Sequence, residues 1–287
     1  DSAITLLIAT GTHAPMPPDE FGMILPDDIV RRYRVASHDC DAAEQLVYLG
    51  TTARGTPVYA NRHFVEADLR IVVGNLEPHQ FVGFSGGVKA AAVGVAGRET
   101  INTNHAMMVE PYAELGHYDD NPVRQDLEQI GQMMGVQFAL NAVLNRHKQV
   151  VRALAGEPLA VMQAGVPLVR DLVEVPVARA FDLVITSPGG HPKDINLYQS
   201  QKALAHAARV AREGGHAILV AACGEGPGSA HYEDWVSGMP SHEAVLERFR
   251  REQFRLGPHK AVQIARDALR LRVQLVSEMD AARVRRL

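Results

Sequence analysis

The chain has 287 residues, 46% of them hydrophobic, and a formal net charge of −4. This composition is typical of a globular protein with one large domain or two medium ones. The small negative charge and the lack of a long basic run argue against a nucleic-acid partner. No apolar run approaches the ~18 residues of a transmembrane helix. We also recognise no signal peptide, so we expect no membrane partner.

The cysteines and the first residues of the chain give two further expectations. Cys40 and Cys223 lie far apart without a CxxC pair. This pattern argues against a disulfide framework or a thiolate zinc site and favours a reducing cytoplasm. Because the chain begins at Asp1 directly before an apolar run, we expect further residues upstream of it.

Apolar runs alternate with helical patterns in the first 172 residues, which we predict to form an N-terminal domain. We predict buried strands over residues 4–9 and 69–73, a hairpin with arms 47–49 and 57–59, and helices over residues 27–33, 99–108, 121–134 and 157–172. Asn121 is the predicted N-cap of its helix, with Pro122 at the first helical position.

A second domain is predicted over residues 173–287. We predict strands over residues 181–186, 217–222 and 273–276, a helix from Leu197 that is closed by Gly214 and Gly215, and helices over residues 241–254 and 259–269. Alternation of strands and helices predicts the α/β class, with mainly parallel sheets in both domains.

The predicted strands end in loops rich in glycine or histidine, with the sequences GTHAP, EPHQFVGFSGGVK, SPGGHPKD and CGEGPG. Ligands of open α/β sheets bind beyond the carboxyl ends of the strands. His13 and His79 each follow a strand in this way. Each imidazole could serve only to anchor its turn, but as a pair they suit an acid and a base on opposite faces of one carbon.

Residues 85–89 form a Ser-Gly-Gly turn that ends in a lysine. Gly86 and Gly87 could bring amides close to a phosphate, or they could simply provide a tight turn with positive φ. The loop is neither a GxxxxGK[ST] nor a GxGxxG motif. Small apolar residues follow Lys89, so we expect a desolvated amine that can act as a nucleophile or covalent anchor.

Four further residues are candidates for a functional role. His105, on a predicted helix, is either a packed histidine or a ligand for a metal such as nickel. Gln199 and Lys202 share one helical face, which is either simply solvated or binds a carboxylate. Trp235 could belong to a lid or to an interface, and its sequence context favours neither.

Together these motifs resemble the nickel-dependent lactate racemase family, whose members use a nickel-pincer nucleotide. The resemblance rests on IATGTHAPM, SHDCD, LVYLGTTARGTPVYANR, EPHQFVGFSGGVKAAAVGVAG, the TNH that follows, and SPGGHPKDINLYQSQKA. It implies two α/β domains with the active site in a cleft between them. The first domain would anchor the cofactor.

The resemblance also implies roles for single residues. Lys89 would carry the cofactor, a pyridinium-3-thioamide-5-thiocarboxylic acid mononucleotide with nickel, in a loop that includes Ser85, Gly86 and Gly87. His105 would ligate the nickel. The remaining matches are a catalytic pair, His13 and His79, and two residues at the substrate carboxylate, Gln199 and Lys202.

The implied activity is racemisation or epimerisation of a 2-hydroxy acid by hydride transfer to and from the cofactor, with cofactor-synthesis proteins as partners. The family's phosphate-side arginine would fall before Asp1, Val88 replaces a frequent arginine, and His259 aligns with an aromatic over the substrate. Because the change at His259 falls on substrate recognition, lactate, malate, aryl-lactates and sugar acids all remain possible substrates.

Two other functions stay open on the residues alone. One is a nicotinamide-dependent dehydrogenase, against which the lack of GxGxxG counts. The other is a non-catalytic small-molecule binding protein of the same fold. The presence of His13, His79, Lys89 and His105 counts against that second alternative.

Overall fold

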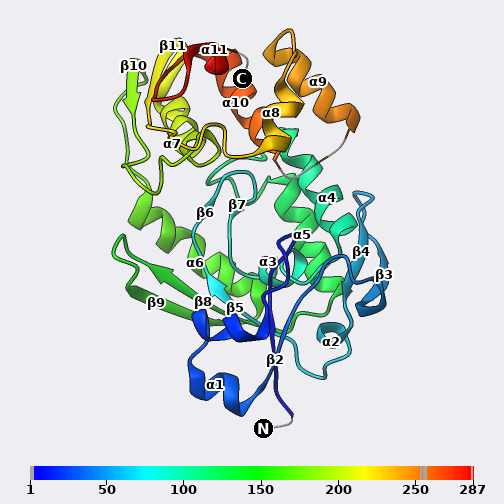
Figure 1. The fold of residues 1–287 in the computed structure, drawn as a ribbon. Coiled ribbons are helices and arrows are strands. Elements are labelled where there is room, and N and C mark those ends of the chain that lie inside the picture. The colour runs from blue at the N-terminus through cyan, green and yellow to red at the C-terminus, as the bar shows by residue number, and fades with distance from the viewer. Residues whose placement is uncertain (1–2, 253, 255–256, 286) are drawn as a thin grey trace. The chain divides into compact units, whose positions relative to one another are not determined.

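A computed structural model describes residues 3–252, 254, 257–285 and 287 (Figure 1). The chain divides into two compact units, Asp1–Glu174 and Val175–Leu287. Each unit combines helices with a sheet that contains parallel strands. The prediction of two α/β domains is therefore confirmed, but mainly parallel pairing holds only in the second unit, because hairpins add antiparallel pairs to the first.

The first unit contains one three-stranded sheet and three two-stranded sheets. Its strands are β1 (Thr5–Ile8), β2 (Arg34–Ser37), β3 (Leu46–Thr51), β4 (Pro57–Asn61), β5 (Ile71–Asn75), β6 (Pro78–His79), β7 (Gly83–Phe84), β8 (Phe138–Leu144) and β9 (Val150–Gly156). Its α-helices are α1 (Asp27–Arg32), α2 (Arg62–Val65), α3 (Lys89–Ala92), α4 (Arg98–Ala106), α5 (Pro122–Met133) and α6 (Pro158–Val173). Short 3-10 helices cover Pro18–Met23, Ala43–Gln45 and Met107–Val109.

The sheet of the first unit has the order β5-β8-β9, with β5 and β8 parallel and β8 and β9 antiparallel. Helix α6 begins at Pro158, and the Glu157 carboxylate caps it by accepting from the amides of Leu159 and Ala160. The helix packs against β8 and β9. Its buried face contributes Met162, Val166 and Val169 to a core cluster that also contains Leu76, Phe84, Tyr118 and Val143.

The second unit has an all-parallel sheet of order β10-β11-β12. Its elements are β10 (Phe181–Thr186), α7 (Leu197–Val210), β11 (Ala211–Val220), α8 (Ala230–Val236), α9 (His242–Glu252), α10 (His259–Arg270), β12 (Arg272–Val276) and α11 (Ala281–Val284). Helix α7 packs on β10 and β11, and α10 packs against α7 and α9.

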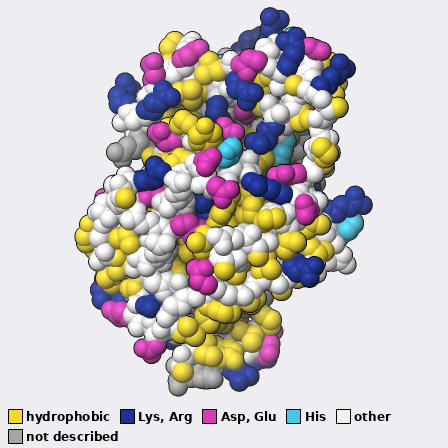
Figure 2. All heavy atoms as spheres, turned by 180° about the vertical axis from the view of Figure 1, so that it is seen from behind, with side chains coloured by type: hydrophobic (Ala, Val, Ile, Leu, Met, Phe, Trp, Pro, Cys, Tyr) yellow, Lys and Arg dark blue, Asp and Glu magenta, His cyan; other side chains and the backbone are white. Residues whose placement is uncertain are grey.

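The expectation that strands 4–9 and 69–73 are buried is wrong: residues 4–9 are all exposed or half-buried, and β5 packs only one face. Ile71 and Val73 are 47% and 67% exposed, whereas Val72 between them is buried. Ile185 of β10 is 66% exposed for the same reason. Alternate strand residues point to opposite faces, and the described helices cover one of them. Figure 2 shows hydrophobic side chains at the surface of the molecule.

The predicted end of the helix from Leu197 is also wrong. Helix α7 ends at Val210, and the chain continues directly into β11 at Ala211, six residues before the predicted strand. Ala211 is buried opposite Phe181, so sheet pairing replaces the helical turn. Gly215 lies within β11, where an added Cβ would approach the Arg212 carbonyl oxygen to 2.8 Å.

The other predicted elements agree with the structure to within a few residues, and Asn121 caps α5 by accepting from the Arg124 amide at 3.0 Å. Residues 253 and 255–256, at the end of the predicted helix 241–254 and just after it, lie outside the described residues. Among the helices that the structure describes, none is long and apolar enough to cross a membrane.

Candidate active site

The segment that follows β5 folds into a small hairpin, β6 and β7, instead of an open loop. Ser85 closes its base: its Oγ lies 3.0 Å from the Asn75 carbonyl oxygen and accepts from the Glu77 amide at 3.0 Å. Gly83 has φ +78, and an added Cβ would lie 1.7 Å from the His117 carbonyl oxygen. Only glycine fits this position, so the hairpin that carries His79 has one tightly fixed shape.

The Gly86-Gly87 turn is held from inside the protein. Both glycines have positive φ, +86 and +55. The Gly87 amide donates to Asn141 Oδ1 at 2.8 Å, and the Gly86 carbonyl accepts from Arg124 Nη1 at 3.1 Å. The Gly87 amide is thus engaged within the protein, and the tight-turn interpretation explains both glycines.

Lys89 begins helix α3 two residues after this turn and is half-buried. Burial lowers the pKa of its amine to about 8, the positive charge of Arg124 acts in the same direction, and Glu77 opposes it. A substantial share of the amine is therefore neutral near physiological pH. The neutral amine is the nucleophilic form, as the sequence analysis anticipates for this position.

The structure brings His79 and His105 against the same aromatic ring, that of Phe81. The Phe81 ring lies edge-to-face with both imidazoles, with centroid distances of 4.8 Å to His79 and 4.9 Å to His105. The His79 Nδ1 accepts from the Val82 amide at 3.3 Å, which fixes the ring on its hairpin. Residues from a hairpin and from a helix 26 positions away in the numbering thus meet at Phe81.

A buried network sets the tautomer of His105. Its Nδ1 lies 3.0 Å from Asn104 Oδ1, while Asn104 Nδ2 donates to Asp126 Oδ2 at 2.8 Å. Because the carboxylate takes the amide nitrogen, the Asn104 oxygen faces His105, and Nδ1 must be the donor. The lone pair then belongs to Nε2, which is the arrangement of a histidine that ligates a metal.

Two threonines from the TTARGT hairpin complete this network. Thr52 Oγ1 donates to Asp126 Oδ1 at 2.6 Å, and Thr56 Oγ1 donates to Asp126 Oδ2 at 2.8 Å. Asn104, Asp126 and both threonines were not predicted as site residues from the sequence. The adjacency of Asn104 to His105 was the one available signal, since Asp126 follows it by 22 residues.

His13 is exposed in the turn after β1. Its amide donates to the Thr10 carbonyl, and the Gly11 amide donates to the Gly94 carbonyl at 3.0 Å. Gly94 must be small here, because an added Cβ would lie 2.5 Å from the Ala9 Cβ. The turn of His13 is thus fastened to the segment that follows Lys89.

In the second unit, Gln199 and Lys202 lie together on α7. The Lys202 ammonium is exposed and donates to Gln199 Oε1 at 3.0 Å. The Asn196 side chain caps the helix by accepting from the Gln199 amide at 3.0 Å. The predicted i, i+3 pair is therefore formed, with the cation at the surface.

A second lysine near this pair was missed by the sequence analysis. Lys260 of α10 is buried, donates to Gln263 Oε1 at 2.9 Å and lies 5.3 Å from the centroid of the Tyr198 ring. Burial lowers its pKa to about 7, and the positive charge of Lys202 adds to this effect. Cations at this end of α7 favour an anionic ligand.

His259 and Trp235 occupy core positions of the second unit. His259 is 6% exposed, and its ring packs against Tyr198 at a centroid distance of 5.8 Å. Trp235 is 5% exposed, packs against Phe249 and donates from Nε1 to Glu252 at 3.2 Å. Trp235 is therefore a packing residue of α8 and not part of a surface lid.

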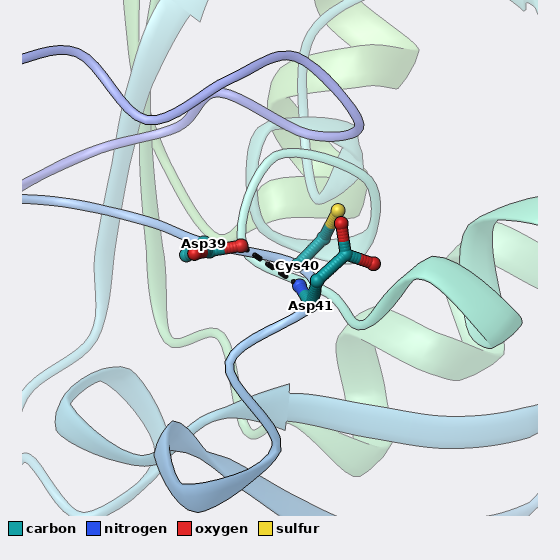
Figure 3. A group of neighbouring side chains, drawn as sticks. All are labelled: Asp39, Cys40 and Asp41. Atoms are coloured by element: carbon teal, nitrogen blue, oxygen red, sulfur yellow. Dashed lines mark hydrogen bonds between the residues drawn. The ribbon is translucent and has the colours of Figure 1, made fainter.

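Asp39, Cys40 and Asp41 form the one cluster of potential metal ligands among the described residues (Figure 3). Both oxygens of Asp41 already accept from Arg98, at 2.6 and 2.7 Å. Asp39 Oδ1 accepts from the Asp41 amide at 2.9 Å, as the dashed line shows. The charge of this cluster is thus used to fasten Arg98, at the start of α4, and we assign no metal to it.

Comparison with known proteins decides the family. The model of the lactate racemase N-terminal domain matches residues 1–116, and that of the lactate racemase C-terminal domain matches residues 177–284. The chain belongs to the lactate racemase family. The lactate racemase of Thermoanaerobacterium thermosaccharolyticum is 32% identical over 247 residues, and that of Lactiplantibacillus plantarum is 33% identical over 250 residues.

The aligned regions cover 85% and 86% of this chain, and the chain spans 58% and 59% of the length of these two lactate racemases. The structure of the T. thermosaccharolyticum lactate racemase apoprotein superposes with a TM-score of 0.91 at 29% identity, over 99% of this chain and 69% of that one. A protein of Thermotoga maritima shares the fold, with a TM-score of 0.72 at 20% identity, over 98% and 77% of the respective chains.

Proposed function

We propose that this member of the lactate racemase family racemises or epimerises a 2-hydroxy acid, with lactate as the first substrate to test. The observation that carries the proposal is the convergence on Phe81: one imidazole suited to proton transfer and one suited to metal ligation lie against the same ring. A lysine with a lowered pKa follows on the same segment. Membership of the family supports the same activity.

The residues of the first unit fit a tethered nickel-pincer nucleotide. Lys89 offers a nucleophilic amine, and the Asn104 contact makes Nε2 the His105 nitrogen that carries the lone pair. Ser85, Gly86 and Gly87 would shape the segment beside the tether. When bound, the cofactor would supply a reversible acceptor for the α-hydride of the substrate.

The remaining side chains would manage charge and protons. Lys202 would bind the substrate carboxylate through a charge-assisted hydrogen bond, with Gln199 beside it. His13 and His79 would each exchange a proton with the substrate hydroxyl, one for each mirror-image product.

Loading of the protein would need cofactor-synthesis proteins as partners. A reducing cytoplasm is the compartment we propose, because both cysteines are free and buried.

The test is intact-mass spectrometry of the protein produced together with the cofactor-synthesis enzymes. We expect a covalent mass increment in the wild type that Lys89→Ala abolishes, and interconversion of D- and L-lactate in a chiral assay. Noncovalent NAD without an adduct would instead point to a dehydrogenase. A folded protein without any ligand would point to a binding role.

The His105→Ala variant separates metal ligation from tethering. We expect it to lose nickel in elemental analysis and to keep the organic adduct on Lys89. Retention of a full complement of nickel would refute the assignment of His105 as a ligand.

A further inference from the structure

Among the described residues, Arg124 has the largest side chain that is fully buried, with 1% of its surface exposed. It lies in the first turn of α5, after the Asn121 cap and Pro122. A buried guanidinium is costly unless each of its N–H groups meets an acceptor. The acceptors of Arg124 therefore show what this cation holds in place.

One side of the guanidinium holds the segment before Lys89. Nη1 donates to the carbonyl oxygen of Gly86 at 3.1 Å and lies 3.4 Å from that of Phe84. Nη2 is close to the turn as well, since an added Cβ on Gly87 would lie 2.8 Å from it. The lysine segment thus closes over the arginine and leaves no room for a side chain at Gly87.

The other side of the guanidinium is anchored to its own helix. Nε and Nη2 donate to Glu128 Oε1 at 2.8 and 2.5 Å. The Tyr118 hydroxyl also donates to this oxygen at 3.1 Å, and the Tyr118 ring packs on the guanidinium at 5.1 Å. The orientation of Arg124 is therefore fixed independently of the lysine segment.

Lys89 shares an acceptor with Arg124. The Lys89 amide donates to the Gly86 carbonyl at 3.3 Å, the same oxygen that Arg124 holds. From the opposite side, Asn141 accepts the Gly87 amide at 2.8 Å and donates to the Gly74 carbonyl at 3.1 Å. The turn before Lys89 is thus clamped between α5 and β8.

We propose that Arg124 is a positioning residue for Lys89. By holding the Gly86 carbonyl, Arg124 orients the lysine amine for attack on an electrophile. The inference rests on the proposed function, in which Lys89 carries the cofactor. It goes further because it assigns the orientation of the Lys89 amine to Arg124, a residue of helix α5.

The charge of Arg124 supports this role. Arg124 lowers the pKa of Lys89 in addition to burial, while Glu77 raises it. Glu128 neutralises part of the guanidinium charge, with the Tyr118 hydroxyl beside it. Removing the Arg124 charge should therefore raise the Lys89 pKa, and removing the Glu128 charge should lower it.

The test is competitive labelling of the full chain, without cofactor, by acetic anhydride across pH 6–11. The neutral amine attacks an acetyl carbon, acetate leaves and the amine loses a proton. Peptide mass spectrometry then reports acetylation at Lys89. We expect a midpoint near 8 in the wild type, about one pH unit higher in Arg124→Gln and lower in Glu128→Gln.

Two further variants separate charge from geometry. Arg124→Lys keeps the cation but not the planar fork, so the midpoint should stay near the wild-type value. Its covalent adduct, after production with the cofactor-synthesis proteins, should fall several-fold. Arg170→Gln is the matched control, because the Arg170 guanidinium lies 5.7 Å from the centroid of the Phe84 ring but donates to the Gly116 carbonyl. Its midpoint should not change.

A folded Arg124→Gln protein with the wild-type midpoint and adduct yield would overturn the inference. If Arg124→Gln does not fold, Arg124→Lys decides, and a wild-type adduct yield there would overturn the inference equally. The labelling needs no cofactor. A wild-type protein without an adduct would therefore refute the proposed function. The shifts in labelling would still test the effect of Arg124 on the Lys89 amine.

Discussion

The two sets of candidate residues differ in how firmly they are held. The segment from Glu77 to Lys89 is fixed by buried partners on α5 and β8 and by glycines that accept no side chain. Gln199 and Lys202 instead lie on one helical face, where Lys202 is exposed and the pair is joined by one hydrogen bond. This difference suits the proposed roles: a cofactor tether would need a fixed origin, whereas an adjustable cation could meet a substrate carboxylate.

The largest effect should come from Gly83→Ala. The new Cβ would lie 1.7 Å from the His117 carbonyl oxygen at φ +78, so the hairpin must rearrange. We expect a loss of more than ~3 kcal/mol in the free energy of unfolding, measured by urea denaturation.

Gly189→Ala, in the second unit, is the matched control. It also has positive φ, +97, but no atom lies within 4 Å of an added Cβ. Only the backbone strain of ~1–2 kcal/mol should appear. Equal losses in the two variants would contradict the difference in rigidity between the two regions.

Lys202→Ala should lower kcat/KM for lactate by ~10–100-fold, the value of a charge-assisted hydrogen bond of about 1.5–3 kcal/mol. The cofactor-loaded protein is assayed by chiral chromatography, and the mass of the Lys89 adduct should not change. Lys193→Ala removes an exposed lysine in the preceding loop and should have little effect. An equal loss in both variants would mean that general electrostatic attraction, and not a specific contact, binds the carboxylate.

Asn104→Leu should weaken nickel retention by ~10-fold, because His105 loses the acceptor that fixes its tautomer. Nickel per protein is measured by elemental analysis after dialysis against a chelator. Gln125→Leu changes an exposed amide on α5 and serves as the control. An identical nickel content in both variants would show that the contact between Asn104 and His105 does not contribute to metal binding.

Lys260→Met should change how stability depends on pH. The folded-state pKa of about 7 lies below the ordinary value, so the unfolded chain binds more protons between pH 7 and ~10. Wild-type stability should therefore rise with pH in this range, by up to ~1 kcal/mol per pH unit from this residue. Urea denaturation at pH 7, 8 and 9 should show a flatter profile for Lys260→Met.

Most helices and strands, and the glycine- and histidine-bearing segments that follow the strands, could be predicted from the sequence because apolar periodicity and capping residues are local signals. It failed on burial: an apolar run such as residues 69–73 looks the same whether one face or both are covered. It also missed the residues that hold the site. Asn141 meets Gly87 across 54 positions, and Arg124 meets Gly86 across 38. Such pairs arise only when the sheet and helix α5 come together.

The uncovered sheet faces have a practical consequence for handling the protein. Ile71 and Val73 of β5 stand opposite Phe138 and Leu140 of β8, and all four side chains are at least 39% exposed. Contiguous apolar surface of this kind attracts fluorescent hydrophobic dyes and promotes precipitation as the concentration rises. Val73→Lys places a charge in its middle and should raise the solubility limit without disturbing the buried side of the sheet.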